Sequence, residues 1–125
     1  MDQLLRDGVA FFVARADGHA AGCGGVLLVG PEYAEAKRMY VRPAFRGRGV
    51  GRRMLDHLVT HAQRRGLRVV RLETGIHQRE AIALYERYGF RRIPPFGAYR
   101  DDPVSLCYEM RLPRERRSLP VTPAD

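Results

Sequence analysis

The sequence has few cysteines and no long apolar run. Its two cysteines, Cys23 and Cys107, are too few for a disulfide scaffold and lack the spacing of a metal site, so we expect both to be reduced and to fill space in the core. No stretch approaches the roughly 18 apolar residues that cross a bilayer, and the start of the chain lacks the apolar segment of a signal peptide. These absences predict a cytoplasmic protein that binds no metal.

Acidic residues are scarce beside basic ones. The 22 Lys and Arg outnumber the 14 Asp and Glu, which gives a net charge of +8. This excess implies an anionic partner, either a phosphate-bearing cofactor or nucleic acid, although a solvated arginine-rich surface needs no partner at all. No predicted strand carries exposed aromatic residues in the stacking arrangement of a module that binds single-stranded nucleic acid, so nucleic acid is the less favoured partner.

With 125 residues, of which 45% are hydrophobic, the chain has the size and apolar content of one domain. We expect this domain to cover residues 1–112 and to be followed by a flexible, arginine- and proline-rich tail over 113–125. The pattern of apolar residues, glycines and prolines predicts strands at 9–15, 20–29, 34–41, 67–74, 90–93 and 104–112, helices at 50–65 and 78–88, and a long loop at 94–103. Strict alternation predicts that one face of the third strand carries Glu35, Lys37, Met39 and Val41.

The most informative segment is the glycine- and arginine-rich stretch from Arg42 to Arg52, which ends a strand and opens a helix. Its glycines at 47, 49 and 51 allow several backbone N–H groups to approach a phosphate. The helix that follows adds the positive end of its dipole, and the arginines add full charges. The segment therefore predicts a binding site for a cofactor that carries a pyrophosphate.

Three classes of phosphate loop compete for this segment. A Walker loop needs Gly-Lys-Ser/Thr, whereas this chain has arginine at the last two of those positions. A dinucleotide fingerprint needs a third glycine where Arg52 stands, although an acid at the end of the next strand, Glu73, keeps that alternative open. The third class, R-x-x-G-x-G, is satisfied by Arg46, Gly49 and Gly51.

Together with Met39–Pro43 before the loop and Ala81–Phe90 after it, the R-x-x-G-x-G spacing makes residues 9–112 resemble the GCN5-related N-acetyltransferase (GNAT) family. The resemblance implies an α/β fold with a mixed, mainly antiparallel sheet covered by two helices. It further implies that the central parallel pair of strands, 34–41 and 67–74, is splayed. The splay would free backbone groups near the end of the first of these strands for a cofactor.

Family members usually begin with a strand and two helices before the segment that starts here at Val9. The resemblance therefore implies an N-terminally shortened member, in which Leu4 and Leu5 are the remnant of the second helix. Without those elements the strand at 9–15 would be an exposed edge beside an uncovered apolar face, and proteins usually hide both. We expect a second copy of the chain to cover them, which predicts a homodimer.

The resemblance also implies acetyl-CoA-dependent N-acetylation of a primary amine by direct transfer, with a small molecule as the acceptor. The positions that it assigns to cofactor binding are Met39, Tyr40, Val41, Arg46, Gly47, Arg48, Gly49, Val50, Gly51, Arg52 and Gln78. Two alternatives remain open. The chain could be a degenerate acetyltransferase that binds coenzyme A without turnover, or a basic nucleic-acid-binding module.

Direct transfer needs a base for the acceptor ammonium, stabilisation of the oxyanion and an acid for the departing thiolate. Tyr85 matches the tyrosine that acts as general acid in many family members, although its helical spacing also fits a core aromatic. Glu35 matches a catalytic glutamate of some members, although a surface carboxylate paired with Lys37 fits the sequence as well. Glu73, or water acting through either acid, is the rival base.

The histidines do not decide between these candidates. His77 just precedes the second predicted helix and is a candidate for lining the acceptor site. His57 and His61 fall on the polar side of the first predicted helix, so we expect both to be solvated.

Overall fold

The computed structural model describes residues 2–6 and 9–113. Over these ranges the elements are β1 (Asp2–Arg6), β2 (Val9–Ala16), β3 (His19–Val29), β4 (Tyr33–Val41), η1 (Pro43–Phe45), α1 (Val50–Arg64), β5 (Val69–Gly75), α2 (Arg79–Tyr88), β6 (Arg91–Ile93), η2 (Gly97–Tyr99) and β7 (Ser105–Arg111). Every predicted strand and helix is confirmed to within two residues at each end. The tail predicted at 113–125 lies, beyond Pro113, outside the described residues. No helix in the described part is long and apolar enough to span a membrane.

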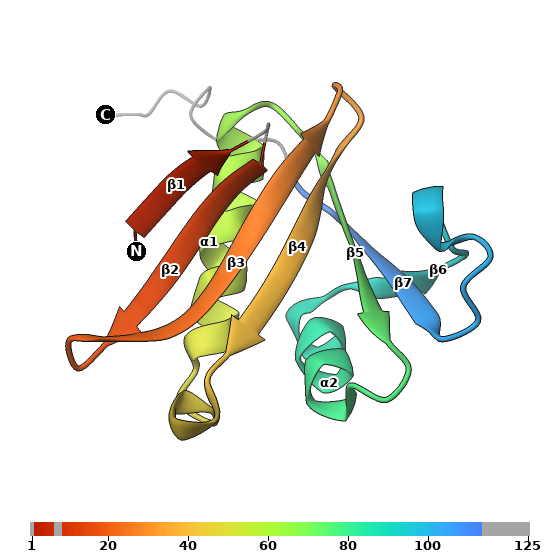
Figure 1. The fold of residues 1–125 in the computed structure, drawn as a ribbon. Helices are drawn as coiled ribbons and strands as arrows, with labels where there is room; N and C mark the ends of the chain where they lie inside the picture. Colours follow the sequence, from red (N-terminus) through yellow and green to blue (C-terminus); the bar gives the residue numbers. More distant parts are fainter. Residues whose placement is uncertain (1, 7–8, 114–125) are drawn as a thin grey trace.

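The strands form one mixed, mainly antiparallel sheet, as predicted. Across the described residues the strand order is β1-β2-β3-β4-β5-β7-β6, and only the central β4–β5 pair is parallel. Figure 1 shows α1 behind the β1–β4 half of the sheet and α2 beside the opening between β4 and β5. The face opposite α1 is called the open face below.

The strand β1 corrects two expectations about the start of the chain. Residues 2–6 pair antiparallel with residues 9–13 of β2. Leu4 and Leu5 therefore belong to an extended strand and are not the end of a helix. The strand predicted at 9–15 is consequently not an exposed edge over its first residues, because β1 is hydrogen-bonded along them.

The parallel β4–β5 pair is short. Its register comprises Ala34 opposite Val70, Glu35 opposite Arg71 and Ala36 opposite Leu72. Beyond these pairs the two strands diverge, and Figure 1 shows the opening widening toward their carboxyl ends. The predicted splay is therefore confirmed. It leaves one edge of β4 from Lys37 to Val41 without a partner among the described strands.

A bulge in β4 corrects the predicted face of this strand. The register against β3 shifts where β4 has one extra residue, around Arg38, whose φ of 54° is left-handed. An extra residue reverses the side-chain alternation that follows it. Met39 and Val41 consequently pack toward α1, whereas Glu35 and Lys37 lie on the open face. The prediction that all four share one face is wrong for this reason.

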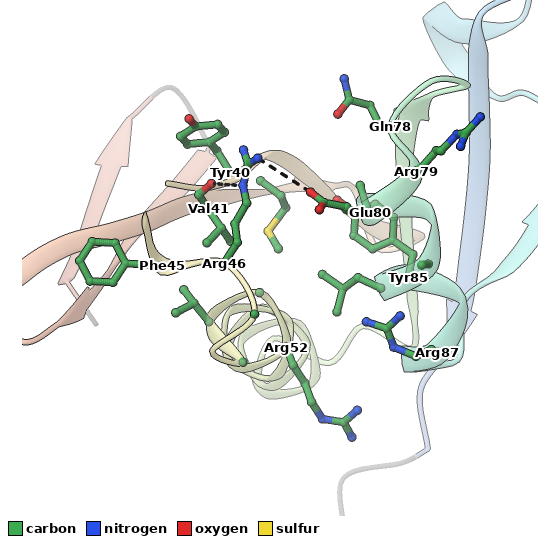
Figure 2. A pocket seen from close by; sticks show the side chains of 18 of the residues that line it. Tyr40, Val41, Phe45, Arg46, Arg52, Gln78, Arg79, Glu80, Tyr85 and Arg87 are labelled. Carbon is green, nitrogen blue, oxygen red and sulfur yellow. Dashed lines mark hydrogen bonds and ion pairs between the residues drawn. The ribbon is translucent and has the colours of Figure 1, made fainter. Parts of the chain in front are cut away.

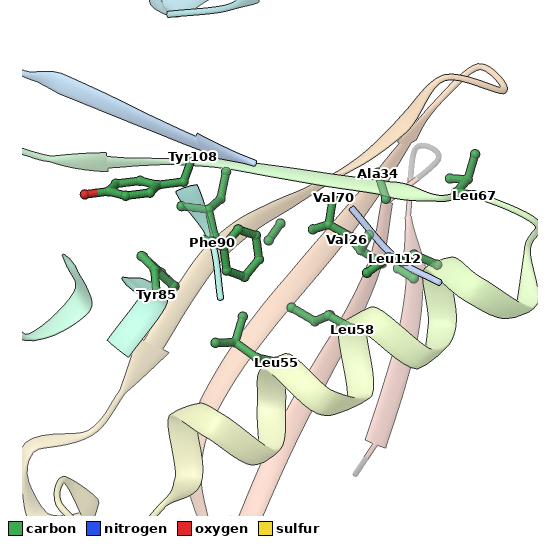
Figure 3. Close-up of a cluster of buried hydrophobic side chains, with 14 of the residues drawn as sticks. Val26, Ala34, Leu55, Leu58, Leu67, Val70, Tyr85, Phe90, Tyr108 and Leu112 are labelled. Atoms are coloured by element: carbon green, nitrogen blue, oxygen red, sulfur yellow. The ribbon is translucent and has the colours of Figure 1, made fainter. Parts of the chain in front are cut away.

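The main core lies between the sheet and α1. The apolar stripe predicted for this helix is buried, and Leu55 and Leu58 pack in the same cluster as Val26 and Val70 (Figure 3). Ala34 on the facing strand is fully buried and allows the helix to approach closely. Burial of each leucine contributes about 1.5–3 kcal/mol, so this packing fixes where the first turn of α1 lies.

Two histidines of α1 face the sheet, and the prediction that they are solvated is wrong. The ring centroids of His57 and His61 lie 4.3 and 5.5 Å from that of Phe12 on β2, both in edge-on geometry. The sheet extends beyond the apolar stripe of the helix, so residues that flank the stripe are covered as well. Burial lowers the pKa of both imidazoles, and nearby positive charges, Arg64 and Arg65 among them, lower it further.

We predict that His57 and His61 reduce stability in mild acid. Their folded-state pKa values lie below the unfolded value of 6.5, so the unfolded chain binds more protons and stability falls as the pH drops below that value. Replacing both with Gln should reduce the loss in free energy of unfolding between about pH 7 and pH 5. Urea unfolding of the parent and the double variant at both pH values measures this, and an equal loss in the two proteins contradicts it.

Candidate active site

A cavity of about 770 Å³ lies between the end of β4, the first turn of α1, and α2 (Figure 2). Its lining comes from residues within 39–41, 45–52 and 77–87. These segments meet because α1 follows β4 through η1 and the glycine loop, and α2 follows β5 through a short turn, at the ends where the two strands have parted. The edge of a sheet at which parallel strands end is a common ligand site in α/β folds.

The structure brings nearly all the predicted cofactor-binding positions to this cavity. It is lined by Met39, Tyr40, Val41, Arg46, Gly47, Gly49, Val50, Gly51, Arg52 and Gln78. Tyr85 and His77 line it too. Arg48 and Glu35 do not, and their positions are described below.

Three of the residues of the 46–51 loop that line the cavity are glycines, which put no side chain between the backbone and a ligand. Gly47 and Gly49 have left-handed φ values of 77° and 79°, which glycine adopts without strain. Gly49 is the N-cap of α1, and no side chain makes a capping hydrogen bond at this end of the helix. The first turn of α1 holds no acidic residue. The first N–H groups of the helix are thus available to an anion. Gly51 serves packing, since a Cβ there would lie 2.8 Å from the Leu84 side chain of α2.

Arg46 spans the cavity between β4 and α2. Its Nε donates a hydrogen bond to the Val41 carbonyl at 3.0 Å, and its Nη1 lies 3.8 Å from Oε1 of Glu80 (Figure 2). Its guanidinium also lies over the Tyr40 ring, 5.7 Å from the centroid. The charge of Arg46 is therefore fixed beside the glycine loop. The Arg48 side chain points elsewhere and pairs with an acid of the β2–β3 turn, Asp17, at 2.9 Å.

Besides Arg46, the cavity is lined by the arginines Arg52, Arg79 and Arg87. Figure 2 shows Arg52 of α1 and Arg87 of α2 on the side away from Gln78. The Arg52 guanidinium lies over the Tyr88 ring, 5.5 Å from its centroid, and the Tyr88 hydroxyl donates to Asp56 at 2.7 Å. The cavity therefore carries positive charge on this side as well as at Arg46.

Tyr85 belongs both to the core and to the cavity. Its side chain is buried and its ring lies 5.9 Å from Phe90 and 6.5 Å from Tyr108, between centroids. Burial, with a smaller effect from Glu73, raises the pKa of its phenol to about 12. No other described residue hydrogen-bonds its hydroxyl. The phenol is therefore protonated at neutral pH and free to donate to a ligand.

Glu35 lies on the open face, across the sheet from Tyr85. Its side chain is almost fully buried, and Oε2 accepts a hydrogen bond of 2.7 Å from the Tyr99 hydroxyl. The Lys37 ammonium lies 3.7 Å from the same oxygen, so the predicted pairing with Lys37 is present although the carboxylate is not a surface group.

A second carboxylate lies near Glu35 on the open face. Glu73 follows Arg71, the register partner of Glu35, by two residues and therefore lies further toward the parted ends of the strands. The Ser105 hydroxyl lies 2.6 Å from Oε2 of Glu73 and 2.9 Å from Oδ2 of Asp102. Two acids thus flank the opening from the face opposite Tyr85.

Some residues of the site were not predicted from the sequence to be site residues. Those that line the cavity are Phe45, Arg79, Glu80, Ala81, Ala83, Leu84 and Arg87. The spacing of Ala81 and Leu84 from Tyr85 was a usable signal, because residues three and four apart share a helix face. Tyr99 lies in a loop and carried no periodic signal. Among the residues that the structure describes, no group of three or more His, Cys, Asp or Glu side chains could hold a metal ion.

Comparison with known proteins identifies a family. The family model described as "Acetyltransferase (GNAT) family" matches residues 2–90. An IAA acetyltransferase from Azospirillum brasilense is 41% identical over 113 residues, which cover 90% of this chain and 74% of that protein.

Solved structures show the same fold. A Klebsiella pneumoniae protein solved as a candidate acyl-CoA N-acyltransferase is 39% identical, with a TM-score of 0.81 over 87% of this chain and 76% of the other. A GNAT family acetyltransferase from Elizabethkingia anophelis, solved with acetyl-CoA bound, has a TM-score of 0.73 over 84% of this chain and 77% of the other at 20% identity.

Proposed function

The chain belongs to the GNAT family of acetyltransferases, and from this premise we propose that it transfers the acetyl group of acetyl-CoA directly to a primary amine of a small molecule. One observation carries the proposal. The cavity joins an uncapped helix N-terminus, a fixed arginine and a protonated tyrosine at the point where β4 and β5 part. These are the groups that a pyrophosphate and a departing thiolate require.

The cofactor is proposed to lie along the cavity from the glycine loop to the opening between the strands. Its pyrophosphate would accept hydrogen bonds from the N–H groups of residues 47–51 and an ion pair from Arg46, with Arg52 adding charge nearby. Its pantetheine arm would pair with the free edge of β4 at residues 39–41, as an added strand does. Gln78, the N-cap of α2, contributes an amide on the other wall. The backbone N–H groups of the bulged end of β4 would polarise the acetyl carbonyl.

The proposed reaction places the acid and the base on opposite faces of the sheet. The acceptor ammonium loses a proton to a carboxylate on the open face, and the neutral nitrogen attacks the acetyl carbonyl carbon to form a tetrahedral oxyanion. Collapse of this intermediate breaks the carbon–sulfur bond, and the thiolate takes the phenol proton of Tyr85. The nitrogen gives up its second proton, which restores the phenol through solvent. Glu35 is the proposed base and Glu73 its competitor.

The small-molecule acceptor is supported by the cover over the open face. Phe96 and Tyr99, from the loop between β6 and β7, pack against Tyr33 and Glu35 there. This loop lies over part of the face that carries the two carboxylates, and we infer from its position that a compact amine reaches them more readily than an extended peptide. The carboxylates themselves favour an acceptor that is cationic before it reacts.

Thiol release from acetyl-CoA tests the function. We expect it only when a primary amine is present, with the acetylated amine as product, and with small amines reacting faster than peptides of matched concentration. Cofactor binding measured by calorimetry without transfer to any amine would support the degenerate acetyltransferase instead. Binding of nucleic acid with no affinity for acetyl-CoA would support the nucleic-acid-binding module.

The glycine loop gives the first prediction from this site. Gly49→Val should weaken acetyl-CoA binding by about 1–3 kcal/mol, because the side chain blocks the approach of the phosphate to the helix N–H groups. Gly66→Val is a matched control, since Gly66 has a similar left-handed φ of 82° and equally open surroundings but does not line the cavity. Both variants carry the same backbone strain. If calorimetry gave the two variants equal affinities for acetyl-CoA, the proposal that the loop binds the pyrophosphate would be refuted.

The second prediction from this site concerns the Tyr85 hydroxyl. Tyr85→Phe should lower turnover by about 10²-fold and leave the affinity for acetyl-CoA unchanged, because a general acid acts mainly in the transition state. Tyr88→Phe removes a hydroxyl from the same helix outside the cavity lining and should turn over normally. A Tyr85→Phe enzyme with full turnover, where chemistry limits the rate, would return this residue to a purely structural role.

We also propose that the chain forms a homodimer through its open face. The strand β2 is not an exposed edge, since β1 pairs with it, but the open face beside it carries apolar side chains. Val9, Phe11, Val13 and Leu27 are only partly buried there, and Phe11 lies against Gly25 of β3. Apolar side chains that gather on one face in this way can form an interaction surface. In this dimer each subunit would complete the acceptor side of the other.

Light scattering measures the assembly. We expect the mass of two chains for the parent, the mass of one for Phe11→Lys, and a specific activity that rises with protein concentration in the parent. A parent that stays monomeric at its highest soluble concentration contradicts the dimer, and full activity of that monomer shows that no partner residue is needed for transfer.

A further inference from the structure

The loop between β6 and β7 is docked on the open face by an aromatic cluster. Phe96 is buried, and its ring makes edge contacts with Tyr33 at 5.7 Å and with Tyr99 at 5.4 Å, between centroids. The Arg71 guanidinium lies over both the Tyr33 and Phe96 rings, at 4.5 and 5.4 Å, and donates to Glu109 at 3.0 Å. These contacts give the loop a fixed position against β4 and β5.

From this position Tyr99 reaches across two strands. Its element, η2, follows β6 at the far edge of the sheet, and β7 and β5 lie between that edge and β4. Its hydroxyl nevertheless donates to Oε2 of Glu35 at 2.7 Å. Burial raises the pKa of the Tyr99 phenol, and the hydrogen bond to Glu35 raises it further, so the donor keeps its proton at neutral pH.

Within the described residues, both contacts of Glu35 are made to the same carboxylate oxygen. Tyr99 and Lys37 both approach Oε2, and within the described residues no donor reaches Oε1. The titratable and charged groups that face Glu35 from the elements around it are Lys37 on β4, Arg71 and Glu73 on β5, Cys107 on β7 and Tyr99.

We propose that Tyr99 is a positioning residue, which holds Glu35 by Oε2 so that Oε1 is presented to the acceptor amine. This inference rests on the proposed function, in which Glu35 is the base. A carboxylate held at one oxygen by a short hydrogen bond cannot rotate away, and its other oxygen keeps its lone pairs for the acceptor ammonium. The loop at 94–103 thereby becomes part of the active site without lining the cofactor cavity.

Removal of one hydroxyl tests the proposal. Tyr99→Phe should lower kcat by about 10-fold, the scale of one hydrogen bond to a charged group, and should leave the KM for acetyl-CoA unchanged. The acid limb of the rate–pH profile should move to higher pH, because the carboxylate has lost a donor. Tyr33→Phe is a matched control that removes a hydroxyl from the same aromatic cluster without touching Glu35, and it should leave both kcat and the profile unchanged.

A double-mutant cycle shows whether Tyr99 acts through Glu35. In the Glu35→Gln background, Tyr99→Phe should cause no further loss of kcat. Additive losses, or an unshifted profile in Tyr99→Phe, overturn the positioning role. If Ser105→Ala shifts the profile and Tyr99→Phe does not, Glu73 is the base and the proposal is wrong, although transfer itself stands. A parent protein that transfers no acetyl group to any amine overturns the proposed function and this inference with it.

Discussion

The short parallel contact between β4 and β5 is the constraint on which the rest of the site depends. Three residue pairs hold the two halves of the sheet together, and the strands then part. The same divergence exposes the free edge of β4 and makes room for α2 beside the opening. It also puts the N-terminus of α1 at one end of a cavity whose other wall carries Tyr85. A fully paired β4 and β5 would leave β4 no free edge and would leave no opening for α2 to lie beside.

The bulge in β4 is accommodated by glycines of the neighbouring strand β3. A Cβ at Gly22 of β3 would lie 2.6 Å from the Tyr40 carbonyl oxygen, and one at Gly24 would lie 2.7 Å from Sδ of Met39. Glycine at these two positions therefore gives the bulged strand the space that it needs. The bulge turns Met39 and Val41 toward α1 and leaves Glu35 on the open face. The cofactor wall and the proposed base thus occupy opposite faces of one strand because of one extra residue.

Local sequence signals were enough for the elements and for most of the residues that meet at the cavity. The R-x-x-G-x-G spacing, the stripe of α1 and the glycine after α2 act over a few residues, so they could be recognised without tertiary information. The bulge at Arg38 could not be recognised in this way, since it depends on the register of β3 against β4. The burial of His57 depends on how far the sheet extends past the helix, and the contact of Tyr99 with Glu35 joins residues 64 positions apart across two strands. Such contacts are set by topology and leave no periodic pattern.

The central claim is that acetyl-CoA occupies the opening between β4 and β5, paired with the free edge of β4. Backbone hydrogen exchange, measured by mass spectrometry with and without acetyl-CoA, tests this claim most directly. The account predicts the largest slowing of exchange at residues 39–41 and 47–51, with β6 unaffected. Unchanged exchange at residues 39–41 in a protein saturated with acetyl-CoA would contradict it, because the cofactor would then lie outside the parted strands.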